Sequence, residues 1–220
     1  MKNCIILGFG RSGTSLMGGL LYNSGYFLGN HLHPARETNP RGFFEDVIIN
    51  RINEQILEPY DYCKIHKEYP VFPKPHSPYC PRRGHHWLAY IEPGTIIQCH
   101  DETVIDQIKK AIANKQPFAY KDPRFNYTLP VWLPHLPEDT RYICMFRNPA
   151  SVVRSVIKEC HAVEYLKDFH IDEELAYRIW FNFYRHLLDS LSPELLPKMI
   201  FVDYEELVAG KCTDHIAAFL

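Results

Sequence analysis

The stretch NCIILGFGRSGTSL, residues 3–16, decides the fold of this chain of 220 residues. The apolar run from Ile5 to Leu7 predicts a buried strand, and the apolar residues after Thr14 predict a helix. Glycines at positions 8, 10 and 13 lie between the two. Such a loop lets backbone N–H groups approach a phosphate closely, and the positive end of the helix adds to the attraction. The alternative is a tight strand-to-helix turn in which the glycines serve packing alone.

This loop departs from that of nucleotide triphosphatases. Their pattern G-x-x-x-x-G-K-[ST] matches residues 8–15 except that Thr14 stands in the lysine position. The cation of the loop is Arg11 instead. We therefore expect a site that holds a 5′-phosphate with a charged group beyond it, without the lysine on which ATP and GTP hydrolysis relies.

Composition limits the classes of partner. The net charge of −2, from 24 basic and 26 acidic side chains, provides no general field for nucleic acid or an anionic membrane, so any anion binding is local. No apolar run approaches the length of a transmembrane helix. The seven cysteines form no C-x-x-C pair and match no zinc spacing, so we expect a reducing, cytoplasmic location and no bound metal.

Apolar strands alternate with amphipathic stretches after the first helix, which is typical of an α/β fold with a parallel sheet and crossover helices. Strands are expected at residues 117–121, 141–146 and 199–202, and helices at 46–57, 103–113, 149–160, 173–191 and 205–220. The length fits a single domain over residues 1–220. We therefore predict a P-loop-type three-layer fold, with a central parallel sheet flanked by helices.

Residues 59–94 interrupt this alternation. They are rich in proline and aromatic residues and read as a long ordered insertion. One interpretation is a solvated loop whose aromatic side chains pack on the sheet edge, and the other is a lid that binds an acceptor substrate.

Polar side chains follow the predicted strands and should meet at one edge of the sheet, where ligands bind in open α/β folds. Residues 11–15 follow the first strand, Lys121, Asp122 and Arg124 follow a middle strand, and Arg147 follows the strand ending at Phe146. Ser155 lies about two helical turns beyond Arg147. An arginine and a hydroxyl placed in this way predict a second anion pocket, apart from the first loop. Two anion sites suggest a nucleotide phosphorylated at both its 5′ and 3′ ends.

Four motifs together carry a family resemblance. They are GRSGTS (10–15), KDP (121–123), RNPASVVRS (147–155) and DYEELV (203–208). In this order they resemble the sulfotransferase family, which takes a sulfuryl group from 3′-phosphoadenosine 5′-phosphosulfate (PAPS), and above all its tyrosylprotein and bacterial branches.

The resemblance implies roles for individual residues. It implies that the 5′-phosphosulfate is cradled by Arg11, Ser12, Gly13, Thr14 and Ser15. Arg147 and Ser155 would hold the 3′-phosphate, Tyr204 would lie near the nucleotide, and Lys121 would contact the transferring group. In an in-line transfer to a hydroxyl acceptor, with 3′-phosphoadenosine 5′-phosphate (PAP) as product, Arg11 and Lys121 stabilise the charge on the leaving oxygen without a metal. Lys121 as a surface lysine and Tyr204 as a core residue remain the alternatives.

The acceptor hydroxyl must lose its proton as it attacks, so the site needs a base. The segment NPRGFFED (39–46) resembles a segment of bacterial sulfotransferases and makes Glu45 the first candidate, with Asp46 and Glu37 in reserve and His31, His33 and His66 as weaker candidates. Alternatively, Glu45 or Asp46 caps the helix that follows.

Two other functions remain open at this point. A kinase-like enzyme would bind ATP with magnesium, although Thr14 speaks against it. A non-catalytic nucleotide-binding protein would keep Arg147 and Ser155 but would show no turnover.

Overall fold

The computed structural model describes residues 1–60, 86–163, 166 and 171–220. Within this part of the chain, four parallel strands form one sheet in the order β2-β1-β3-β4. The strands are β1 (Cys4–Leu7), β2 (Ala119–Lys121), β3 (Arg141–Phe146) and β4 (Met199–Asp203). Ile5 of β1 pairs with Tyr120 on one side and with Tyr142 on the other. The predicted parallel sheet is confirmed.

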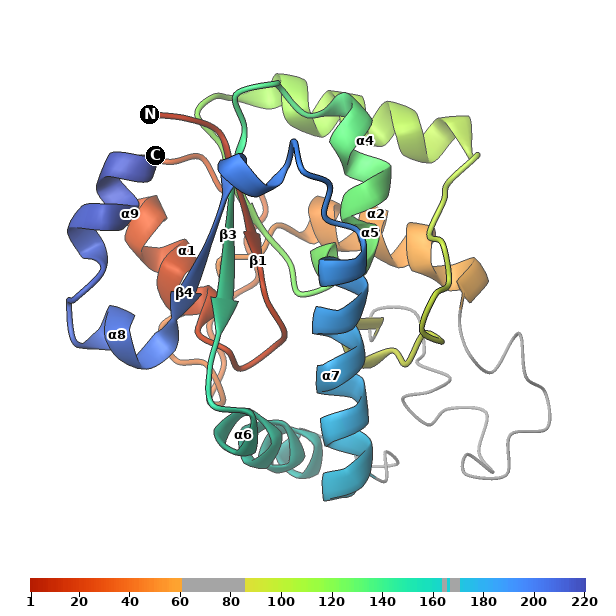
Figure 1. The fold of residues 1–220 in the computed structure, drawn as a ribbon, viewed down its shortest axis with the longest axis vertical. Helices are drawn as coiled ribbons and strands as arrows, with labels where there is room; N and C mark the ends of the chain where they lie inside the picture. Colours follow the sequence, from red (N-terminus) through yellow and green to blue (C-terminus); the bar gives the residue numbers. More distant parts are fainter. Residues whose placement is uncertain (61–85, 164–165, 167–170) are drawn as a thin grey trace.

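Helices connect these strands. The α-helices are α1 (Thr14–Asn23), α2 (Val47–Leu57), α4 (Glu102–Asn114), α5 (Phe125–Trp132), α6 (Pro149–Ala162), α7 (Glu173–Asp189), α8 (Tyr204–Val208) and α9 (Thr213–Phe219). Short 3₁₀ turns are η1 (Glu58–Tyr60), η2 (His86–Leu88), η3 (Leu133–His135) and η5 (Leu196–Lys198). Figure 1 shows α1, α8 and α9 on one side of the sheet and α5 and α7 on the other.

Strands β1 and β2 are buried throughout, whereas β4 is partly exposed at Phe201, and alternate residues of each strand point to opposite sides. Ile5 and Leu7 pack into a large apolar cluster with α2, α4, α5, α6 and α7. Cys4 and Ile6 pack into a smaller cluster with α1, α8 and α9. The two clusters share one sheet, so the predicted three-layer α/β arrangement is confirmed.

Two helices differ from the sequence prediction. The single final helix expected at 205–220 is wrong, because α8 ends at Val208 and α9 begins at Thr213. Gly210 has a φ of 72° between them, a left-handed conformation that ends a helix. The helix α5 was not predicted, and Pro130 lies inside it. Burial of seven of its eight residues holds this helix in place despite the proline.

Of the proposed insertion at 59–94, residues 61–85, which include the weaker base candidate His66, lie outside the described residues, and the lid interpretation stays a prediction. Within the described part of the chain, no helix has the length and apolar character needed to cross a membrane. Since all four strands are parallel, their carboxyl ends meet at one edge. The loops at this edge build the site.

Candidate active site

The loop between β1 and α1 has the backbone shape that its glycines require. Gly8 and Gly13 have φ values of 126° and 92°, which side chains other than glycine rarely adopt. A Cβ atom at Gly8 would lie 2.4 Å from the carbonyl oxygen of Met145, and one at Gly13 would lie 2.4 Å from Cδ2 of Tyr204. Both glycines are therefore needed for the close approach of the loop to β3 and to Tyr204.

Side chains of α5 and α7 form hydrogen bonds with this loop. Asn126 of α5 accepts a 2.7 Å hydrogen bond from the Gly8 N–H. The hydroxyl of Tyr184 on α7 accepts from the Phe9 N–H, donates to the Met145 carbonyl at 2.8 Å and lies 3.1 Å from the hydroxyl of Ser12. Burial raises the pKa of Tyr184, so the phenol stays neutral. Neither support was predicted from the sequence, because Asn126 and Tyr184 are both far from the loop along the chain.

The N-terminus of α1 points out of the loop without a side-chain cap. Its N-cap residue is Gly13, and no side chain accepts a hydrogen bond there. By contrast, α2, α4, α6 and α7 each have an Asp or Asn side chain that caps the first turn. The first N–H groups of a helix lack partners within the helix. This end of α1, next to Thr14 and Ser15, therefore has the character of an anion site.

Arg11 lies at the centre of this loop and contacts two other segments. Its Nε donates to the hydroxyl of Ser155 at 3.0 Å, and its Nη1 and Nη2 both lie 3.3 Å from the carbonyl oxygen of Thr38. Glu159 of α6 lies 3.7 Å from Nη1. Ser155, which the sequence analysis assigned to a pocket apart from the loop, thus contacts the loop through Arg11.

Lys121 ends β2 with its ammonium group between the loop and Glu45. The Nζ atom forms an ion pair with Oε1 of Glu45 and lies 3.3 Å from the Ser15 hydroxyl and 3.4 Å from the Phe43 carbonyl oxygen. The side chain of Lys121 is only 3% exposed, and that of Glu45 is 12% exposed. Lys121 is therefore not the surface lysine of the alternative reading. Its ammonium group contacts both the Glu45 carboxylate and Ser15 of the loop between β1 and α1.

Asp46 has a different place from its neighbour Glu45. Its Oδ1 accepts from the N–H groups of Ile48 and Ile49, at 2.8 and 3.3 Å, and its Oδ2 accepts from the His31 N–H at 2.9 Å. The structure thus gives Asp46 the helix-capping role that the sequence analysis held open. Of the two acids, Glu45 faces the ionic contacts of the site.

Arg147 and Tyr204 meet at the carboxyl ends of β3 and β4. The guanidinium carbon of Arg147 lies 4.3 Å from the centre of the Tyr204 ring, and its Nε donates to Glu205 at 3.1 Å. Tyr204 in turn lies against Gly13. Arg147 and Tyr204 are therefore next to the loop, on the side that faces β4.

A pocket of about 260 Å³ opens over the loop and Lys121. Five residues expected from the sequence line it, namely Arg11, Thr14, Ser15, Glu45 and Lys121, together with the weaker base candidate His33. Of the other walls, Gly10 belongs to the predicted loop, Asn39 and Phe43 to the 39–46 segment, and Pro123 and Arg124 to the stretch that follows β2. The site roles of Arg36, Asn50, Trp87 and Glu159 were not predicted from the sequence. Ser12, Gly13, Arg147, Ser155 and Tyr204 do not line this pocket. Ser12, within the loop, is fully buried.

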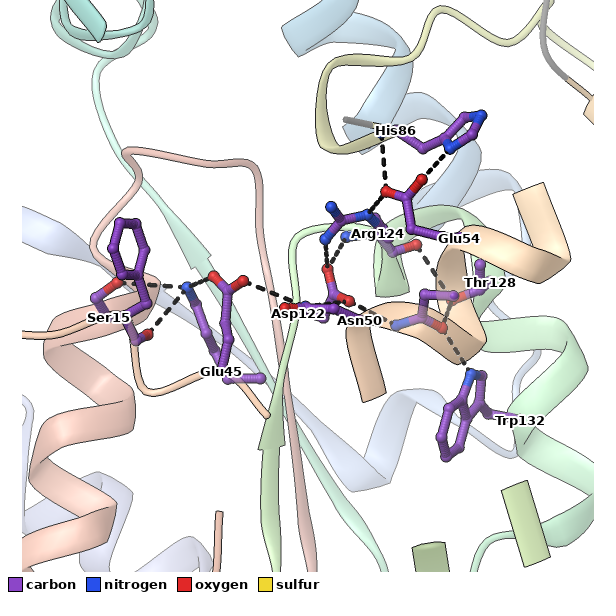
Figure 2. A network of polar contacts seen from close by, with 12 residues as sticks. Ser15, Glu45, Asn50, Glu54, His86, Asp122, Arg124, Thr128 and Trp132 are labelled. Atoms are coloured by element: carbon purple, nitrogen blue, oxygen red, sulfur yellow. Dashed lines mark hydrogen bonds and ion pairs between the residues drawn. The ribbon is translucent and has the colours of Figure 1, made fainter. Parts of the chain in front are cut away.

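A buried polar network surrounds Arg124, one of the residues that line the pocket (Figure 2). Arg124 forms ion pairs with Asp122 and Glu54, and Glu54 also contacts His86. Burial alone would lower the pKa of Arg124, but the charges of Asp122, Glu54 and Glu45 outweigh burial and raise it. The guanidinium is therefore a permanent cation, held by carboxylates beneath the site.

This arrangement fits an anionic group at the loop and a hydroxyl at Glu45. Arg11, Lys121 and the free helix end supply positive charge, and Glu45 supplies a carboxylate beside them. Among the described residues, no group of three or more His, Cys, Asp and Glu side chains is arranged to hold a metal ion.

The sequence and the fold of the chain were compared with those of known proteins. No curated protein matches the sequence. Among solved structures, the sulfotransferase domain from the curacin biosynthetic pathway is similar in fold, with a TM-score of 0.51 and 13% identity over 99% of this chain and 73% of that one. Residues 4–213 match the model of the sulfotransferase family, which confirms the resemblance seen in the motifs. The chain belongs to the sulfotransferase family.

Proposed function

We propose that this sulfotransferase moves the sulfuryl group of PAPS to a hydroxyl acceptor by in-line, metal-independent transfer. The observation that carries the proposal is the position of Lys121 between Glu45 and the anion loop. One pocket thus contains a cation for the transferring group and a carboxylate for the proton of the acceptor.

The donor end of the pocket suits a phosphosulfate. Arg11, Ser15 and the N–H groups at the start of α1 would hold the 5′-phosphosulfate. Arg147 is the candidate for the 3′-phosphate, and Ser155 would assist through its contact with Arg11. The ring of Tyr204 contacts the guanidinium of Arg147, and Tyr204 would line the side of the loop that faces the nucleotide.

The chemical step follows from the position of Glu45. Glu45 accepts the proton of the attacking hydroxyl as the new oxygen–sulfur bond forms. The bond between sulfur and the bridging oxygen breaks, and PAP leaves with the negative charge on its 5′-phosphate. Lys121 and Arg11 stabilise this charge, and they do so more in the transition state than before it. Proton uptake by Glu45 also removes the charge that holds Lys121, which frees the ammonium for the leaving oxygen.

Calorimetric titration is the first test. Wild-type protein is titrated with PAP and, separately, with ATP and magnesium, and Arg147→Ala is titrated in the same way. We expect PAP to bind and Arg147→Ala to weaken it. ATP binding with no preference for PAP would favour the kinase-like alternative and overturn the proposed donor.

Substitutions at neighbouring acids test the base. With PAPS and a panel of phenols, sugars and short peptides as acceptors, Glu45→Gln should lower kcat by about 100- to 10,000-fold. PAP affinity should hold, because Glu45 does not belong to the proposed nucleotide contacts. Asp46→Asn is the matched control and should keep most of the activity, since Asp46 caps α2. Equal losses in the two variants would argue against Glu45 as the base.

Lys121→Met tests the cation in the same assay. Removal of one group that stabilises developing charge typically lowers kcat by about 100- to 1,000-fold. A wild-type protein that binds PAP but sulfates none of these acceptors, and does not hydrolyse PAPS, would support the non-catalytic alternative.

A further inference from the structure

Asn50 of α2 lies between the proposed base and a buried acid. Its Nδ2 donates to Oε2 of Glu45 at 3.2 Å and to Oδ2 of Asp122 at 2.7 Å. The side chain lines the pocket, yet the residue is only 8% exposed. Figure 2 shows Asn50 between the two carboxylates.

The chemistry of an amide fixes how Asn50 is oriented. Ionised carboxylates only accept hydrogen bonds, so the NH₂ group of Asn50 must face both Glu45 and Asp122. An amide nitrogen carries two hydrogens, which allows one bond to each acid. No other uncharged side chain of this size could serve two carboxylates with two donors from one atom.

Asp122 is the rigid end of this contact. It is fully buried, and it also accepts from Asn53 at 2.9 Å and from the Nη1 and backbone N–H of Arg124, both at 2.9 Å. The orientation of Asn53 is fixed in turn, because its Oδ1 accepts from the donor-only indole N–H of Trp132 at 2.8 Å. Asp122 therefore cannot turn without breaking several bonds.

We propose that Asn50 is a positioning residue for Glu45. It links Oε2 of the base to the buried Asp122, so that the carboxylate stays directed into the pocket beside Lys121. A hydrogen bond to the charged form of an acid favours that form. This role rests on the proposed function, in which Glu45 is the base. The other charged or titratable groups around the pocket are Arg11, His33, Arg36, Lys121, Arg124 and Glu159.

The test follows the protonation of Glu45 directly. Protein labelled with ¹³C at the glutamate carboxyl carbon is titrated by NMR in the presence of PAP, and the Glu45 signal is assigned by its loss in Glu45→Gln. The variant Asn50→Leu keeps the approximate volume and removes both donors. Asn50→Ser keeps one hydroxyl donor, which cannot serve both acids, and covers the case in which Asn50→Leu does not fold.

Asn53→Leu is the matched control, because Asn53 donates to the same oxygen of Asp122 at 2.9 Å, whereas the contact with Glu45 comes from Asn50. Thr128→Val is a milder control, since its hydroxyl donates to Asn53 at 2.8 Å. In Asn50→Leu we expect the pH at which Glu45 is half protonated to rise, because the donor to its charged form is lost, with a smaller rise in Asn50→Ser. In both controls this pH should stay as in the wild type, even where thermal stability falls.

The outcomes separate the two proposals. A Glu45 midpoint that does not move in the Asn50 variants, or that moves equally in the controls, would overturn the positioning role. The titration needs no acceptor. A wild-type protein that transfers no sulfuryl group would therefore refute the proposed function, while the titration would still show whether Asn50 acts on Glu45. Where an acceptor is found, Asn50→Leu should lower kcat about tenfold and leave PAP affinity unchanged.

Discussion

At the scale of single residues, the site depends on two adjacent acids with different tasks. Glu45 reaches Lys121 and Asn50, whereas the oxygens of Asp46 accept three backbone N–H groups. The chain turns into α2 at this point, so consecutive side chains point in different directions. Sequence alone leaves the two acids equivalent, and the helix start distinguishes them.

Gly13 offers a prediction at the same scale. Gly13→Ala should destabilise the protein by about 1–3 kcal/mol from the unfavourable φ alone, and by more because its Cβ would lie 2.4 Å from Tyr204. PAP binding should fall with it, because the loop and Tyr204 must move apart. Urea denaturation and calorimetry measure the two effects.

Gly25→Ala is the control for this prediction. Gly25 has nearly the same φ, 90° against 92°, but nothing lies within 4 Å of a Cβ placed there. It should lose stability through the backbone alone and keep its affinity for PAP. Equal losses of stability and affinity in the two variants would show that the contact with Tyr204 has no effect.

At the scale of elements, the cap of α2 carries a prediction. Asp46→Ala removes the acceptor for Ile48 and Ile49, and we expect a loss of about 1–2 kcal/mol in the free energy of unfolding. The loss also includes the tie to His31, which joins the start of α2 to the segment before it. Urea denaturation gives the value. Asp101→Ala at the exposed start of α4 is the comparison and should lose less, because that carboxylate caps a single backbone N–H.

Helix starts were readable from the sequence, and helix ends and breaks were less so. Asp46 and Asn148 each precede an apolar periodic stretch, and both cap the helices predicted from them. Gly210 divides the last predicted helix, although the apolar residues around it continue. Pro130 argues against a helix that burial nevertheless stabilises. Local signals therefore identify elements well where propensity and packing agree, and fail where tertiary packing outweighs propensity.

At the scale of the whole molecule, the pocket residues that directly follow a strand were predictable from the sequence. Those that come from other elements were predicted less well. Arg11 and Lys121 were expected at the pocket because parallel strands end at one edge. Asn50 lines the same pocket from α2, whose packing no local pattern reveals. Trp87 also lines the pocket, although it lies far from the β1–α1 loop along the sequence. The cation and loop chemistry was thus predictable, while the network that supports it required the fold.

The last prediction concerns the stability of the molecule in acid and rests on His186 of α7. Its Nε2 lies 3.2 Å from the Ile91 carbonyl oxygen and 3.1 Å from that of Glu92, so this nitrogen carries the hydrogen and donates to both. Burial lowers the pKa of His186, and the neighbouring carbonyl groups and Asp189 only partly offset this. The folded protein therefore favours the neutral ring, whereas the unfolded chain takes up a proton near pH 6.5.

The sign of the effect follows from this difference. Above about pH 6.5 both states hold a neutral ring, and the stability from His186 is fully present. As the pH falls below 6.5 toward the lowered pKa of the folded state, the unfolded chain binds more protons, and the free energy of unfolding decreases. We expect urea denaturation to show lower stability at pH 5.5 than at pH 7.5. His186→Gln keeps a side-chain N–H donor without titrating, so it should show a shallower fall. His100→Gln, at an exposed position, should keep the wild-type slope. An unchanged slope in His186→Gln would mean that other groups cause the loss in acid, and that the link from α7 to residues 91–92 does not respond to pH.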